Sequence, residues 1–111
     1  MQTLDHAFDQ DGALADLLDD FQPRPGQARL ARRIADCLEN RRDLVAEAAT
    51  GTGKTLAYLL PALARGERVI ISTGTLNLQD QLFQRDLPLA LRATGAELDV
   101  ALLKGRANYL C

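Results

Sequence analysis

Leucine and other apolar residues recur at helical spacing in several stretches of the chain. In residues 13–20, leucines lie on one face and aspartates on the other, which predicts a short amphipathic helix. Two prolines and a glycine interrupt the pattern. A second apolar stripe then predicts a helix from about 25 to 40, with Pro25 suited to its first turn.

Two further helices are predicted in the second half of the chain. One spans residues 54–66 and contains Pro61, which removes a backbone hydrogen bond and is expected to kink the helix. The other spans residues 75–87, with Thr75 as its N-cap and Pro88 beginning a further turn.

Short apolar runs alternate with these helices. Residues 43–48, 68–73 and 98–103 are rich in Val, Ile and Leu and read as buried strands. Strands that alternate with helices form a parallel sheet with crossover helices. The pattern therefore predicts an α/β fold, a parallel sheet with flanking helices.

The size and composition agree with a single domain of an ordinary globular protein. The chain has 111 residues, of which 47 % are hydrophobic and 25 % charged. The apolar run at 56–64 is far shorter than the roughly 20 residues of a membrane span, and the N-terminus lacks a basic region followed by an apolar core. A cytoplasmic protein without a membrane anchor is expected.

Charge divides the chain into two parts. Residues 1–20 carry six Asp and no Lys or Arg, whereas residues 21–111 carry 13 basic and nine acidic side chains, a net charge of +4. A nucleic-acid partner is compatible with this charge, but so is an ordinary solvated surface.

The stretch "AATGTGKT", residues 48–55, matches the phosphate-loop pattern G-x-x-x-x-G-K-S/T except that Ala48 replaces the first glycine. Its glycines allow backbone N–H groups to surround an anion at the start of the following helix. Lys54 can then reach the outer phosphates, and the Thr55 hydroxyl can bind Mg²⁺. The alternative is a glycine-rich turn without function. The predicted nucleotide site comprises Ala48, Ala49, Thr50, Gly51, Thr52, Gly53, Lys54 and Thr55.

Four blocks, "FQPRPGQ", "ATGTGKT", "VIISTGTLNLQDQL" and "ALLKGRANYLC", together resemble superfamily 2 helicases of the iron–sulfur DinG/YoaA-like branch, which is related to XPD. The resemblance covers about residues 21–111. It implies the N-terminal part of a RecA-like domain that binds ATP and Mg²⁺. In the complete family, ATP hydrolysis drives 5′ to 3′ translocation along single-stranded DNA.

The resemblance also implies roles for individual residues. Arg24 and Gln27 correspond to the motif that recognises adenine, and a Gln amide can form a bidentate pair with the adenine edge. Alternatively, Gln27 caps the first turn of its own helix. Ala48 is usual in the phosphate loop of this branch.

The block "STGTLNLQDQL" is similar to motif Ia, which contacts the backbone of single-stranded DNA. The alternative is a helix whose leucines, Leu76, Leu78 and Leu82, face the core and whose polar side chains are simply hydrated. The candidate DNA contacts are Thr73, Thr75, Gln79 and Gln81.

Cys111 follows "GRANYL", where the family has the first of four thiolate ligands of a [4Fe–4S] cluster. The cluster is expected only in a longer chain. Cys37 reads as a small core residue. The resemblance divides the chain into an acidic helical leader, 1–20, and the first part of the ATP-binding domain, 21–111, which ends where the iron–sulfur insertion begins.

The sequence contains no Asp-Glu dipeptide, so the family's acidic residues for Mg²⁺ and for the attacking water are absent from these 111 residues. This chain by itself is therefore expected to be inactive as a helicase. Two other functions remain open: another P-loop NTPase, and a non-catalytic module that binds a nucleotide or a partner.

Overall fold

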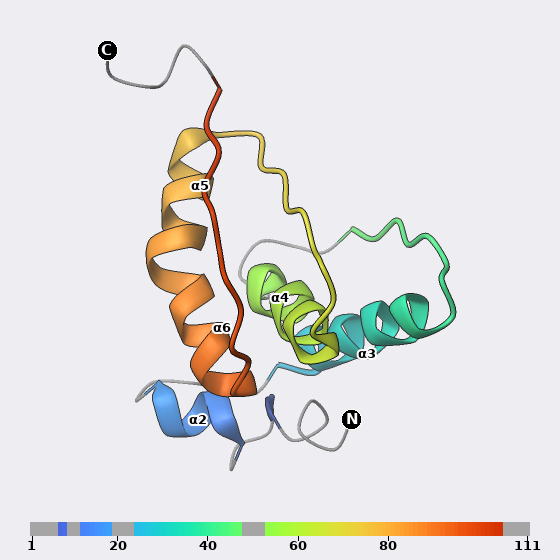
Figure 1. The fold of residues 1–111 in the computed structure, drawn as a ribbon. Coiled ribbons are helices and arrows are strands. Elements are labelled where there is room, and N and C mark those ends of the chain that lie inside the picture. The colour runs from blue at the N-terminus through green and yellow to red at the C-terminus, as the bar shows by residue number, and fades with distance from the viewer. Residues whose placement is uncertain (1–6, 9–11, 19–23, 48–52, 106–111) are drawn as a thin grey trace.

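The computed structural model describes residues 7–8, 12–18, 24–47 and 53–105. Within these ranges, helices are joined by loops (Figure 1). The helices are α2 (Ala13–Leu17), α3 (Pro25–Glu39), α4 (Lys54–Arg65), α5 (Leu76–Gln81), the π-helical turn η1 (Leu82–Asp86) and α6 (Leu87–Thr94).

The ends of α3 and α4 follow from local sequence and confirm the predicted helices. Pro25 lies in the first turn of α3, where its missing N–H costs no hydrogen bond. Helix α4 lies between two glycines in the left-handed region, Gly53 (φ 75°) before it and Gly66 (φ 71°) after it. Pro61 is accommodated inside α4 and is buried.

Helices α5, η1 and α6 follow one another without a loop and form one long helical segment, shown in orange in Figure 1. Thr75 is the N-cap of α5, as predicted. Its hydroxyl accepts a hydrogen bond from the N–H of Leu78 at 3.2 Å. The helix continues past the predicted end at 87 to Thr94. Pro88 has no N–H to donate to the preceding turn, and the widened turn η1 ends at Asp86, two residues before it.

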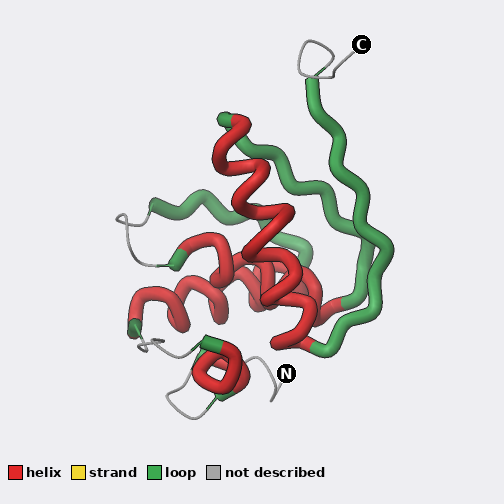
Figure 2. The backbone as a smooth tube through the Cα atoms, turned by 90° about the vertical axis from the view of Figure 1, so that its left-hand side faces the viewer, coloured by secondary structure: helices red, strands yellow, loops and turns green. Residues whose placement is uncertain are grey.

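The predicted parallel sheet is not formed in the described part of the chain. The segments at 43–47, 68–73 and 98–103 are loops, and Figure 2 shows no strand among the residues that the structure describes. Apolar side chains that a parallel sheet would bury are exposed here, including Val45 (99 %) and Ile70 (93 %). The hydrogen bonds of a helix lie within one segment, whereas those of a parallel sheet require segments distant in sequence to align. None of these three segments pairs with another in the described part of the chain.

The core lies around α4, which packs between α3 on one side and α6 on the other, while α2 packs against α6 (Figure 1). Leu59 and Leu60 of α4 are fully buried. Among the described residues, no helix has both the length and the apolar character to cross a membrane. The buried hydrophobic residues are Ala7, Phe8, Leu14, Ala31, Ala57, Leu59, Leu60, Leu63, Leu87, Leu89, Ala90 and Ala93.

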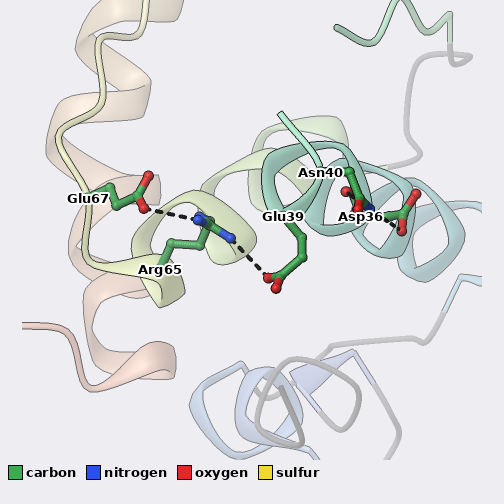
Figure 3. A network of polar contacts seen from close by, with 5 residues as sticks. All are labelled: Asp36, Glu39, Asn40, Arg65 and Glu67. Carbon is green, nitrogen blue, oxygen red and sulfur yellow. Dashed lines mark hydrogen bonds and ion pairs between the residues drawn. The ribbon is translucent and has the colours of Figure 1, made fainter. Parts of the chain in front are cut away.

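Arg65 joins the end of α4 to α3. Its guanidinium donates to Glu39 of α3 at 3.1 Å and to Glu67 at 2.9 Å (Figure 3). The hydrogen bond and the charge of Arg65 lower the pKa of the Glu67 carboxyl. A carboxyl with a lowered pKa in the folded state contributes stability at neutral pH, and this contribution is lost as the pH falls through that pKa. Both carboxylates are exposed, so the contribution is small.

Candidate functional site

The start of α4 has the geometry of an anion-binding site. Gly53 adopts the left-handed conformation (φ 75°, ψ 41°) and brings the chain into the helix without a side-chain cap. No side chain of the described residues therefore caps the N–H groups of the first turn of α4. The positive end of the helix dipole lies at this terminus. Lys54, the first helical residue, is exposed, and Thr55 is half-buried. Backbone donors and the positive end of the helix dipole thus coincide at the start of α4, and Lys54 is the first residue there.

Gln27 of α3 lies directly against this site. Its side chain is 3 % exposed, and its Nε2 donates to the Gly53 carbonyl oxygen at 3.2 Å. The Oε1 atom of Gln27 is buried and has no hydrogen-bond partner among the described residues. A Cβ on Gly53 would overlap Gln27 Nε2, so a larger residue at this position requires the Gln27 amide to shift. The contact joins the predicted adenine motif to the phosphate loop across 26 residues of sequence.

The side chain of Gln27 does not cap its own helix. The first-turn N–H groups of Gln27 and Ala28 instead donate to the carbonyl oxygen of Arg24, at 3.0 and 3.3 Å. Arg24 is the N-cap residue of α3, and its side chain makes no capping hydrogen bond and is exposed. The capping interpretation of Gln27 is therefore wrong.

Tyr58, one turn after Thr55, borders the site. The pKa of its hydroxyl is raised, chiefly by partial burial; the neighbouring Thr55 side chain lowers it, and the charge of Asp86 raises it. The Thr55 hydroxyl, the predicted Mg²⁺ ligand, is thus within reach of a neutral phenol on the same helix face.

The rest of the predicted loop, Ala48, Ala49, Thr50, Gly51 and Thr52, lies outside the described residues. Of the predicted nucleotide site, the structure therefore describes Gly53, Lys54 and Thr55 together with Arg24 and Gln27.

The four candidate DNA contacts lie at or near the N-terminal half of the long helical segment, and several of their polar groups bond within the chain. Thr73 donates to the Thr75 carbonyl oxygen at 3.4 Å, and the Thr75 hydroxyl caps α5. Gln81 is exposed and, with its amide oxygen turned toward Arg85, accepts from the guanidinium at 2.7 Å.

Gln79 holds a distant segment. Its Nε2 donates to the Leu103 carbonyl oxygen at 3.0 Å, and its Oε1 is buried and has no hydrogen-bond partner in the described part of the chain. One residue on, Asp80 pairs with Lys104 at 3.6 Å. These two contacts hold Leu103 and Lys104 against α5.

The leucine face of α5 does not enter the core. Leu76 and Leu78 are 45 % and 53 % exposed. Helix α5 continues directly into η1 and extends away from α3 and α4 (Figure 1), so these leucines face no opposite helix. The core-facing interpretation is wrong for them.

Cys111 lies outside the described residues. Cys37 is a free, half-buried thiol that lines an open pocket of about 600 Å³ with Leu30, Ile34 and Tyr58, so it is only partly a core residue. The described part of the chain brings no three His, Cys, Asp or Glu side chains together as a metal site.

Sequence reasoning missed the two amide contacts of Gln27 and Gln79. For Gln27 a signal existed: it lies four residues before Ala31, and both are the buried residues of α3 facing α4. No local signal marks Gln79, because its partner is 24 residues away.

Comparison with known proteins places these features in a family. A model of the DEAD/DEAH box helicase family matches residues 24–107. The chain is 52 % identical over 104 residues to the ATP-dependent DNA helicase YoaA of Haemophilus influenzae, covering 94 % of this chain and 16 % of that protein. It is 46 % identical over 96 residues to the ATP-dependent helicase DinG of Mycobacterium tuberculosis, covering 79 % of this chain and 14 % of that protein.

A third relative carries a different activity in its name: the 3′-5′ exonuclease DinG of Bacillus subtilis is 38 % identical over 103 residues, 89 % of this chain and 11 % of that protein. No solved structure matches the chain. The chain thus spans about a sixth or less of the length of these relatives. The chain belongs to the DEAD/DEAH box helicase family and is DinG/YoaA-like, and this membership implies a RecA-like fold.

Proposed function

We propose that the chain is the ATP-binding portion of an ATP-dependent 5′–3′ DNA helicase. In the complete protein, ATP hydrolysis would drive translocation along single-stranded DNA and unwinding. The observation that carries the proposal is the start of α4, where a left-handed Gly53 places the exposed Lys54 at the helix N-terminus. The names of the relatives, ATP-dependent DNA helicase and ATP-dependent helicase, support it.

The described residues fit the phosphates of ATP. Gly53 has no Cβ to obstruct a bound anion, and the first-turn N–H groups of α4 can donate to phosphate oxygens. Lys54 supplies a mobile positive charge that can follow the outer phosphates. Bound Mg²⁺ would neutralise phosphate charge, and Thr55, at the same helix start, can offer it a hydroxyl oxygen.

Arg24 and Gln27 are proposed to recognise adenine. The unpartnered Oε1 of Gln27 supports this role, because a buried acceptor without a donor gains a hydrogen bond from a ligand N–H group. Since its Nε2 is bonded to Gly53, the same side chain would connect the base site to the phosphate site.

The remaining features of the proposal concern the longer protein. Residues 1–20 are proposed to be an acidic leader. Residues 21–111 are proposed to be the first part of a RecA-like domain, whose parallel sheet is not formed in the described part of this chain and would form in the longer protein. Thr73, Thr75, Gln79 and Gln81 are proposed to contact single-stranded DNA, and Cys111 to bind an iron–sulfur cluster. With DNA and ATP as its substrates, the protein is proposed to act in the cytoplasm.

Removal of the Lys54 ammonium is expected to weaken ATP binding by roughly 10- to 100-fold, as for the loss of about 1.5–3 kcal/mol of charge-assisted hydrogen bonding. Calorimetry with MgATP on the native chain and on Lys54→Ala measures this. Lys104→Ala is the matched control, since Lys104 is the other lysine of the chain and pairs with Asp80. Equal affinities of Lys54→Ala and the native chain would remove the phosphate-loop assignment.

A further inference from the structure

The positive charge of the chain is concentrated in one short segment. Residues 24–42 contain six arginines against Asp36 and Glu39, a net charge of +4. Residues 43–111 contain seven basic and seven acidic side chains and are neutral. The excess positive charge of the body therefore belongs to α3 and its flanking residues.

Three of these arginines form a stripe on the outer face of α3. Arg29, Arg32 and Arg33 are spaced three and four residues apart and are all exposed. The opposite face of α3, with Gln27 and Ala31, is buried against α4. We refer to Arg29, Arg32 and Arg33 as the arginine stripe.

The acidic residues near the stripe are engaged elsewhere. Asp36, the next residue on the same face, accepts a hydrogen bond from Asn40 at 3.1 Å, and Glu39 pairs with Arg65 (Figure 3). Within the described residues, no arginine of the stripe pairs with a carboxylate. Arg29 repels Arg32 and Arg33 at these spacings, and Asp36, which follows Arg32 by four residues and Arg33 by three, offsets part of this repulsion.

We propose that the arginine stripe binds the sugar–phosphate backbone of single-stranded DNA, at a surface separate from α5. Guanidinium groups form paired hydrogen bonds with phosphate oxygens, and the stripe presents three of them along one turn of helix. The exposed face of α3 carries no aromatic side chain for base stacking, so the contact is independent of base sequence. The choice of DNA as the polyanion rests on the proposed function, whereas the charged surface does not.

The surface is suited to hold a strand outside the nucleotide site. Helix α3 lies across α4 from α6, and its buried face reaches the phosphate loop through Gln27. A strand on the stripe would therefore lie on the opposite side of the same helix that contacts Gly53, without entering the site itself.

The test is binding of a fluorescently labelled single-stranded oligonucleotide by anisotropy, without nucleotide, over a series of salt concentrations. In Arg29→Gln/Arg32→Gln/Arg33→Gln, three phosphate contacts are lost. The slope of log affinity against log salt is expected to decrease by about 2, since each contact on a single strand contributes about 0.7. The matched control is a second triple variant with the same change of charge on other elements: Arg68→Gln, Arg85→Gln and Arg92→Gln.

The proposal predicts a slope near that of the native chain for the control triple and an unchanged ATP affinity for the stripe triple. An equal decrease of the slope in both triple variants would show a response to net charge alone and would overturn the proposal. A soluble polyglutamate that binds the stripe more tightly than the oligonucleotide would overturn the choice of DNA. Failure of the proposed function would appear in a different measurement, as equal ATP affinities of Lys54→Ala and the native chain. Lys54→Ala should leave oligonucleotide binding in the absence of nucleotide unchanged.

Discussion

Gly53→Ala is expected to destabilise the start of α4 and to abolish measurable ATP binding. Gly53 has φ 75°, and an L-residue held in such a conformation costs about 1–3 kcal/mol. The new Cβ would also overlap Gln27 Nε2 and lie 2.9 Å from Gln27 Cδ. Gln27 is buried, and moving its amide away would break the hydrogen bond from Nε2 to the Gly53 carbonyl oxygen.

Gly66→Ala separates these two causes. Gly66 has nearly the same φ, 71°, but no atom lies within 4 Å of the point where a Cβ would stand, so this variant reports backbone strain without overlap. Urea unfolding should therefore show a larger loss for Gly53→Ala than for Gly66→Ala. Adding Gln27→Ala to Gly53→Ala should remove only the additional loss of stability that Gly53→Ala shows compared with Gly66→Ala. A Gly53→Ala variant as stable as Gly66→Ala would contradict the close contact with Gln27.

Leu59→Ala is expected to lower the free energy of unfolding by about 2–5 kcal/mol, because Leu59 is 0 % exposed at the centre of the packed helices. A loss of this size is a large part of the total stability of a small domain. Leu78→Ala is the control, since Leu78 is 53 % exposed on α5 and should change stability by no more than about 0.5 kcal/mol.

Urea unfolding followed by circular dichroism measures both variants. Similar losses for Leu59→Ala and Leu78→Ala would mean that α4 is not the centre of the core. The helices around it would then have to pack differently from the arrangement in Figure 1.

The sequence predicts those features that depend on neighbouring residues. Pro25, Thr75 and Gly66 mark helix ends because each acts within one turn of its own position. The phosphate-loop pattern likewise locates Gly53 and Lys54, because the left-handed glycine and the lysine after it act at the start of their own helix.

Features that depend on distant segments could not be predicted in the same way. The runs around Val45 and Ile70 are apolar enough for buried strands, but whether they pair depends on partners elsewhere in the chain, and in this structure they are exposed loops. The amide contacts of Gln27 and Gln79 cross 26 and 24 residues. Helical spacing can place Gln27 on the buried face of α3, but it does not identify the atom that either amide contacts.

Titration of MgATP into the isotope-labelled chain, followed by two-dimensional NMR, tests most directly whether phosphates bind at the start of α4. The largest shifts are expected for the backbone N–H groups of Gly53, Lys54 and Thr55 and for the side-chain amide of Gln27. The N–H of Arg92, on α6, should remain unchanged. Saturable ATP binding that leaves Gly53, Lys54 and Thr55 unshifted would contradict a phosphate site at this helix.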